Sequence, residues 1–316
     1  MKDHSQSVAN TGKFIDPRVT AKGEPRARVA LERLETLWFN TGTLCNIACV
    51  NCYIDSSPTN DALAYLTTAE VVTYLDELDS MDMRPREIGF TGGEPFMNPD
   101  MPEMLRTALA RGYEVLLLTN AMRPMQRPSV QSALSTLNTE FPDQLTLRIS
   151  LDHFTAGHHD EMRGAGAFAI TLAGMDWLRD NGFAMTVAAR SLWHETEAET
   201  RAGFAALYTE RGYEIDANHP AKTVIFPEMD MSVEVPEITT ACWGILGKNP
   251  SDIMCAAQRM VVKHKGRSPS VVACTLLPYE EAFDLGPTLE GAMGAVSLNH
   301  PHCAKFCVLG GASCSA

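Results

Sequence analysis

The segment Cys45-Asn-Ile-Ala-Cys49-Val-Asn-Cys52 holds three cysteines separated by gaps of three and two residues. It follows Leu34-Glu-Thr-Leu-Trp-Phe-Asn40, a largely apolar stretch that is typical of a buried strand. A tetrahedral zinc ion or a cubane iron–sulfur cluster closes with four protein ligands. Three thiolates from one short loop therefore leave one metal position open, where another molecule can bind and be activated.

Strands and helices alternate after this loop. With 34–40, the expected strands are 87–91, 113–119, 145–151, 183–189 and 222–226. The expected helices are 67–78 (with Thr68 as its N-cap), 101–111, 168–179 and 195–211. This order predicts an α/β fold with parallel βαβ units, as a partial (β/α)6 TIM-like barrel or an open sheet. In both folds the active site lies at the carboxyl ends of the strands.

Residues 227–250 show no clear period and contain several prolines and glycines, which predicts a domain boundary. We therefore expect an N-terminal extension (1–33), a barrel (34–230) and a small cysteine-rich C-terminal domain (231–316). No separate leader-peptide-binding domain is expected at the N-terminus.

Composition excludes several classes of function. The 316 residues carry a formal net charge of −13, which argues against a nucleic-acid-binding surface. The sequence contains no run of 18 apolar residues, so it predicts no membrane span. The N-terminus lacks the apolar core of a signal peptide. We therefore expect a cytoplasmic protein with no membrane partner. In a reducing compartment, the nine cysteines favour metal binding over disulfides.

A second motif, Gly92-Gly93-Glu94-Pro95, also follows an expected strand. Two glycines allow a ligand to approach the backbone closely, and the Glu94 carboxylate can accept hydrogen bonds from an ammonium group. By itself a Gly-Gly turn capped by Glu-Pro is common loop chemistry. One βα unit after a three-cysteine loop, it carries more weight.

Together the two motifs resemble the radical S-adenosylmethionine (SAM) superfamily. The resemblance implies that Cys45, Cys49 and Cys52 hold a 4Fe–4S cluster whose fourth iron binds SAM. It also implies that Gly92, Gly93 and Glu94 face the methionine part of SAM. Further SAM or substrate contacts are expected at polar strand ends, namely Thr119, Asn120, Ser150, Asp152 and Arg190.

Simpler interpretations stay open for some of these residues. A structural zinc ion that borrows a distant cysteine is the alternative for the three-cysteine loop. Ordinary strand-end capping and surface ion pairing are the alternative for Ser150, Asp152 and Arg190. We expect His153, His158 and His159 to be solvent-exposed loop histidines rather than metal ligands.

The C-terminal cysteines form a second group. Cys255 and Cys274 flank an expected β-hairpin, and Cys303, Cys307 and Cys314 follow a short helical stretch, 289–293. This arrangement resembles the auxiliary-cluster domains called twitch or SPASM. We expect one auxiliary 4Fe–4S cluster with Cys255, Cys274, Cys303 and Cys307 as first-choice ligands, and Cys314 can replace one of them.

A remaining thiol, Cys242, is either a hydrogen-atom donor to a substrate radical or an ordinary buried cysteine.

The expected reaction is reductive cleavage of SAM to a 5′-deoxyadenosyl radical. That radical abstracts hydrogen from a peptide or small molecule, leading to oxidation, cross-linking or epimerisation. Flavodoxin or ferredoxin is the expected electron donor. The alternative from another class is a non-catalytic iron–sulfur electron carrier or scaffold.

Overall fold

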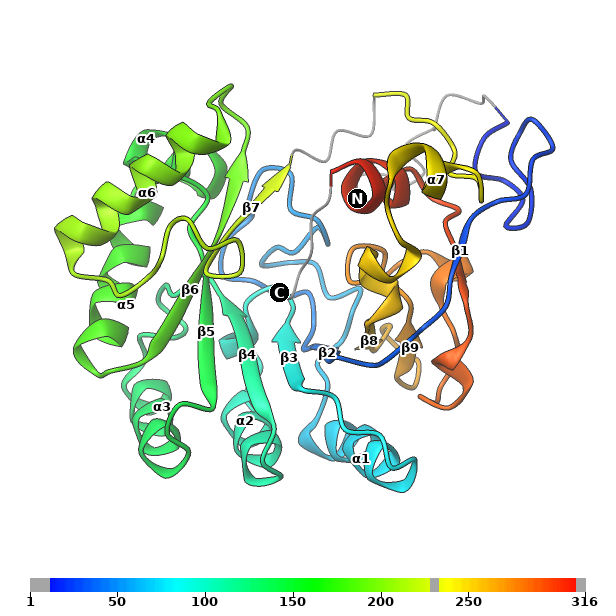
Figure 1. Ribbon diagram of the computed structural model, residues 1–316. Helices are drawn as coiled ribbons and strands as arrows, with labels where there is room; N and C mark the ends of the chain where they lie inside the picture. The colour runs from blue at the N-terminus through cyan, green and yellow to red at the C-terminus, as the bar shows by residue number, and fades with distance from the viewer. Residues whose placement is uncertain (1–11, 228–232, 311–316) are drawn as a thin grey trace.

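The computed structural model describes residues 12–227 and 233–310. Its main sheet has eight strands in the order β7-β6-β5-β4-β3-β2-β8-β9 (Figure 1). Seven run parallel, and only the last pair, β8 and β9, is antiparallel. The strands are β2 (Thr36–Asn40), β3 (Glu87–Thr91), β4 (Glu114–Thr119), β5 (Leu145–Ser150), β6 (Ala184–Ser191), β7 (Thr223–Pro227), β8 (Gln258–Val262) and β9 (Ser270–Val272).

Helices connect the parallel strands and lie around the outside of the sheet (Figure 1). They are α1 (Thr68–Ser80), α2 (Met101–Ala110), α3 (Pro128–Glu140), α4 (Ala156–Arg163), α5 (Ala167–Asp180) and α6 (Glu197–Arg211), with a short α7 (Cys242–Leu246) after the barrel. Strands β2 to β7 with their helices form the six expected units, so the predicted α/β partial barrel is confirmed. Among the described residues, no helix has the length and apolar character needed to cross a membrane.

Three local expectations were inexact. Thr67, not Thr68, caps α1, because its hydroxyl accepts the Glu70 N–H and the Glu70 carboxylate accepts the Thr67 N–H. Helix α3 was not expected, because its N-cap residue makes no side-chain capping bond and only Pro128 marks its first turn. Helix α4 was not expected either, since its sequence, AGHHDEMR, is mostly polar.

The N-terminal segment packs on C-terminal residues. Strand β1 (Arg28–Val29) pairs antiparallel with β10 (Val296–Ser297). The buried guanidinium of Arg26 lies 2.5 Å from the Glu237 carboxylate. The expected hairpin is present as β8 and β9, and β8 extends the barrel sheet beside β2. The division at residues 33 and 230 stays a prediction.

Two features of the core shape the barrel interior. The main core lies between the sheet and the outer helices, and a second core surrounds the C-terminal cysteines. Inside the barrel, Trp38 is buried and donates its indole N–H to Gln258. A Cβ at Gly89 would lie 2.3 Å from the Trp38 ring, so the neighbouring strand must carry glycine there.

Candidate functional site

A cavity of about 170 Å³ lies at the carboxyl ends of the strands. It receives side chains from the cysteine loop, from the ends of β2 to β7 and from the C-terminal region. Its lining includes most of the residues that the sequence singled out, namely Cys45, Cys49, Cys52, Gly92, Gly93, Thr119, Asn120, Ser150, Asp152 and Arg190. Residues from six strand ends therefore converge where the parallel topology predicts.

The three thiols of the cysteine loop line one side of this cavity. Cys45 is buried, and Cys49 and Cys52 are partly buried. Burial raises the pKa of Cys45 to about 12 and also raises that of Cys49. These thiols become thiolates only beside a compensating cation, which metal ions supply.

The glycines of the second motif pack against the cysteine loop itself. The Gly93 N–H donates to the Gly42 carbonyl at 2.8 Å, and the Glu94 N–H donates to the Leu44 carbonyl at 3.1 Å. A Cβ on Gly93 would lie 2.3 Å from the Leu44 oxygen, and Gly92 has a φ of +148°. Glycine is required here because two backbones touch, in addition to any approach by a ligand.

Glu94 is buried and is absent from the cavity lining. Its carboxylate accepts hydrogen bonds from the Thr119 hydroxyl (2.8 Å), the Asn120 N–H (2.9 Å) and the Phe96 N–H (3.2 Å). Burial raises the pKa of Glu94 to about 7 in spite of these bonds. In this structure Glu94 joins the Gly-Gly turn to the end of β4. From the sequence, its carboxylate was instead expected to face an ammonium group.

Asn120 connects the end of β4 to the cysteine loop. Its side-chain amide donates to the Asn46 oxygen at 2.9 Å and lies 4.0 Å from the Cys45 sulfur. The side-chain oxygen of Asn120 accepts the Met122 N–H at 2.9 Å, which fixes the orientation of the Asn120 amide. Asn120 thus holds a polar N–H group beside a candidate ligand thiol.

Asp152 does not offer a free carboxylate to the cavity. It forms a two-point pair with Arg163 through both oxygens, and Arg190 Nε lies 3.4 Å from Oδ1, the oxygen that Arg163 Nη2 also contacts. Burial would raise the pKa of Asp152, but the two guanidinium groups hold it below its ordinary value. Arg190 also donates to the Asn51 carbonyl at 3.0 Å and lies over the Tyr53 ring.

Arg163 is a site residue that the sequence motifs do not indicate. It comes from the last turn of α4 and lines the cavity. Its charge lowers the pKa of Cys49 more than that of Arg190 does. Burial alone would lower its pKa, but Asp152, Cys49 and Cys52 raise it. Only the fold brings Arg163 beside Asp152, 11 residues earlier in the chain.

Two further polar groups were missed, and they test whether the cavity suits a ligand. Asn40 at the end of β2 and Ser56 after the cysteine loop both line the cavity and are buried. Among the described residues, neither Asn40 Nδ2 nor Ser56 Oγ has a hydrogen-bond partner. Because buried polar groups are normally paired, these two atoms fit a bound polar molecule such as SAM or a substrate.

The predicted histidine environment was wrong for two of three residues. His153 and His159 are fully buried, and of the three only His158 is partly exposed. His159 Nδ1 accepts the Asp152 N–H at 3.2 Å, which draws the ring inward. His153 is covered by the rings of Phe154, His158 and Trp193.

A second cavity contains all four first-choice auxiliary ligands, Cys255, Cys274, Cys303 and Cys307. Burial raises the pKa of Cys303 strongly and that of Cys255 to about 11. Cys242 is the first residue of α7 and packs against the core that surrounds the C-terminal cysteines. Its sulfur accepts the Thr239 N–H, and it does not line the cavity at the strand ends. Its role as a hydrogen-atom donor stays a prediction without support from its position. Cys314 lies outside the described residues.

The cysteines of the two cavities supply only soft thiol ligands, three from the cysteine loop and four from the C-terminal region. Sets of cysteine thiolates are the ligands that iron–sulfur clusters take in proteins. The cysteines present therefore fit the cofactor that the sequence implies.

Comparisons with known proteins agree with this geometry. The model of the Radical SAM superfamily matches residues 39–200. Mycofactocin maturase MftC of Mycobacterium ulcerans is 36% identical over 140 residues, 44% of this chain and 35% of that protein. AdoMet-dependent heme synthase of Methanosarcina barkeri is 33% identical over 191 residues, 56% of this chain and 52% of that protein.

Solved structures share the fold. Streptococcus suis SuiB bound to S-adenosylmethionine matches with a TM-score of 0.59 and 11% identity, over 81% of this chain and 63% of that one. SuiB bound to the precursor peptide SuiA matches with a TM-score of 0.54 and 13% identity, over 78% and 61%. The chain spans about a third to a half of the length of the two curated relatives above. The chain belongs to the radical SAM superfamily, whose cofactors are a 4Fe–4S cluster and SAM.

Proposed function

We propose that this protein is a radical SAM enzyme that removes a hydrogen atom from a peptide substrate. One observation carries the proposal. A single cavity at the strand ends collects the three thiols of the cysteine loop, the Gly92–Gly93 backbone and the polar ends of β4 and β5. The cluster and SAM, when bound, supply a 5′-deoxyadenosyl radical able to abstract hydrogen from an unactivated carbon.

The residues around the cavity have distinct proposed roles. Cys45, Cys49 and Cys52 hold the cluster, and the Gly92–Gly93 turn lies along the methionine part of SAM. Thr119, Asn120 and Ser150 supply further polar contacts to SAM. The Glu94 carboxylate acts as a positioning group, since its hydrogen bonds from Thr119 and Asn120 hold the turn against β4.

Charge supports a binding place for the SAM carboxylate. Of the residues that the structure describes, Arg163 and Arg190 are the two cations that line the cavity, and Asp152 pairs with both. A guanidinium group that is already oriented pairs with a carboxylate at low entropic cost. We propose that these arginines face the SAM carboxylate and that Asp152 positions them.

The C-terminal cavity supports one auxiliary cluster on Cys255, Cys274, Cys303 and Cys307. Such a cluster would accept an electron from a substrate radical or relay electrons inward, with flavodoxin or ferredoxin as the external donor. A cytoplasmic location stays a prediction from the sequence.

Two considerations support a peptide over a small molecule. One relative is named a maturase, and one structural neighbour carries a precursor peptide. The cavity also offers two uncharged polar groups, Asn40 Nδ2 and Ser56 Oγ, that have no hydrogen-bond partner within residues 12–227 and 233–310. These groups suit the amide carbonyls and N–H groups of a peptide. The heme synthase relative supports the alternative, a small-molecule substrate.

The first test is anaerobic reconstitution followed by addition of SAM and dithionite. We expect about eight iron atoms per chain, from two cubanes, and release of 5′-deoxyadenosine. Cys45→Ala should lose about four iron atoms and all cleavage, while the matched variant Cys242→Ala should keep its iron. Iron binding without 5′-deoxyadenosine release would favour the non-catalytic electron carrier.

The second test distinguishes the two substrate classes. Two perdeuterated pools are offered, one a tryptic digest of whole-cell protein and the other a protein-free metabolite extract. Abstraction from a peptide transfers deuterium to 5′-deoxyadenosine only with the digest, and mass spectrometry detects it. Deuterium transfer only from the metabolite extract would replace the peptide with a small molecule.

A further inference from the structure

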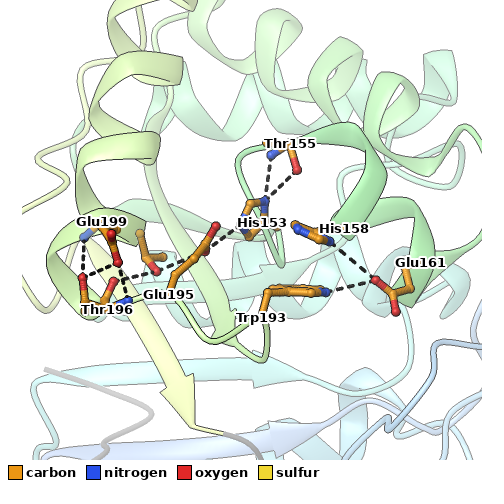
Figure 2. Close-up of polar contacts among 9 residues, drawn as sticks. His153, Thr155, His158, Glu161, Trp193, Glu195, Thr196 and Glu199 are labelled. Atoms are coloured by element: carbon orange, nitrogen blue, oxygen red, sulfur yellow. Dashed lines mark hydrogen bonds and ion pairs between the residues drawn. The ribbon is translucent and has the colours of Figure 1, made fainter.

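Two loops at the carboxyl edge of the barrel bring together a cluster of histidine and glutamate side chains (Figure 2). His153 follows β5, His158 lies in the first turn of α4, and Glu195 lies between β6 and α6. One ligand atom from each of the three lies within 4.8 Å of the other two. This cluster is separate from both groups of cysteines.

His153 is the anchor of the cluster. Its Nε2 lies 2.9 Å from the Glu195 carboxylate. Its Nδ1 accepts the Thr155 N–H at 3.0 Å and lies 2.9 Å from the Thr155 hydroxyl. The ring proton in this arrangement therefore belongs on Nε2, where Glu195 accepts it. Burial keeps the pKa of His153 below its ordinary value despite the opposing effect of Glu195, so the ring is neutral near pH 7.

His158 is held by aromatic packing rather than by chance. Its ring stacks on Trp193 with centroids 4.8 Å apart and planes 23° apart, and it meets the His153 ring edge-on at 4.7 Å. Trp193 is fixed in turn by its indole N–H, which donates to Glu161 at 3.0 Å. The imidazole of His158 is thus preorganised beside His153 (Figure 2).

We propose that His153, His158 and Glu195 bind a divalent first-row transition-metal ion such as Zn²⁺. Two imidazoles and one carboxylate suit this class of ion, whereas Ca²⁺ and Mg²⁺ prefer sets made of oxygen atoms. The His158 side chain is 42% exposed and that of Glu195 is 29% exposed, so the remaining coordination positions face solvent.

The ring chemistry of His153 balances without loss of charge. The metal takes the place of the proton on Nε2, and the ring stays neutral because Nδ1 becomes protonated. The Thr155 hydroxyl at 2.9 Å then accepts the Nδ1–H, as neighbouring groups do for most metal-bound histidines, and the Thr155 N–H that donates to Nδ1 in this structure gives up that acceptor. The Thr155 side chain makes no capping bond to α4, so it is available for this role.

Such an ion would join the loop after β5 to the loop after β6. Asp152 and Arg190, which lie next to these loops in the chain, both line the larger cavity. In this structure only the hydrogen bond between His153 and Glu195 connects the two loops within the cluster. The ion would add stronger bonds between them and so hold the rim of the site more firmly. The proposal does not depend on SAM cleavage or on the identity of the substrate.

The experiment is equilibrium dialysis of the cluster-loaded protein against ZnCl₂, with bound zinc counted by mass spectrometry. His158→Ala and Glu195→Gln should each bind about one zinc per chain less than the unchanged protein. Thr155→Val should weaken this site about tenfold. His194→Asn is the matched control, because His194 is exposed in the same loop, has a φ of +62° that asparagine tolerates, and is outside the cluster.

Hydrogen exchange provides a readout that does not depend on counting. Zinc should protect residues 152–158 and 191–196 in the unchanged protein and in His194→Asn, and in neither ligand variant. Equal zinc in all proteins, or no protection of these two loops, would overturn the proposal. Iron content and far-UV circular dichroism check that each variant is folded and loaded.

Discussion

The carboxylate of Asp152 and the guanidinium of Arg163 meet in a two-point ion pair, with Oδ2–Nε at 2.7 Å and Oδ1–Nη2 at 3.0 Å. Asp152 lies just after the end of β5, and Arg163 lies 11 residues later in the last turn of α4. The pair joins the two ends of the segment that contains α4, and both of its residues line the cavity. It holds a cation beside two cysteines of the predicted cluster site.

Replacing Asp152 should therefore destabilise the protein. In Asp152→Asn, the Arg163 guanidinium stays buried without its counter-charge, and breaking one partner of a buried pair costs about 3–5 kcal/mol. Urea denaturation should show a loss of about that size in the free energy of unfolding. The control Asp180→Asn removes an exposed partner of Arg179 and should change it by less than about 0.5 kcal/mol. Equal stability of the two variants would contradict this account of the pair.

Substitution of Gly93 should disturb the cysteine loop. A Cβ there would lie 2.3 Å from the Leu44 oxygen, so the two backbones must separate. Gly93→Ala should lower the free energy of unfolding by about 1–3 kcal/mol and reduce the iron retained after reconstitution. Gly157→Ala is the control, because a Cβ there meets nothing within 4 Å. Full iron loading of Gly93→Ala would show that contact between the loops is not needed for the cluster.

His159 should make stability depend on pH. Burial, aided by Arg163, lowers its pKa to about 4, from an ordinary value of 6.5. The unfolded chain takes up the proton first, so this contribution is complete above pH 6.5 and is lost as the pH falls toward 4. The loss amounts to at most about 3 kcal/mol.

The matched variant is His159→Asn, whose side-chain oxygen can still accept the Asp152 N–H. Denaturation of both proteins at pH 7 and pH 4.5 should show a smaller decrease for the variant. A decrease of the same size in both would assign the effect to other groups.

The N-terminal segment should come loose when Glu237 loses its charge. The Glu237 carboxylate accepts the Phe14 and Ala21 N–H groups, both at 2.7 Å, and pairs with Arg26. Glu237→Gln leaves the buried Arg26 guanidinium without its counter-charge, so limited proteolysis should cut the segment before β1 faster. Glu234→Gln removes an exposed pair with Lys13 and should digest at the original rate. Equal digestion of both variants would argue against this anchoring.

Much of the fold was predictable because its signals are local. Apolar runs such as Tyr113–Thr119 identify buried strands, and the hairpin at β8 and β9 follows from its turn residues. Helix α4 was not predictable from its polar sequence. It is held in place by packing, since it buries His159 and Met162 against the rest of the molecule.

The candidate site was predictable only where a motif encodes it. The three-cysteine loop and the Gly92–Gly93 turn both line the cavity, as their order in the chain implies. Glu94 belongs to the same motif, yet its side chain turns toward Thr119 and Asn120. A side-chain direction depends on which hydrogen-bond partners the fold supplies, and the motif does not specify them.

The sequence by itself determined the alternation of strands and helices, the open cysteine loop and the family, because residue spacing and periodicity are properties of short segments. Only the tertiary structure decided which distant groups meet. It placed Arg163 against Asp152 and brought Glu195 within 2.9 Å of His153 across 42 residues. It also buried Asn40 Nδ2 and Ser56 Oγ without a hydrogen-bond partner among the described residues. The physical reason is that burial makes every polar group depend on a partner, and packing of separate loops chooses that partner.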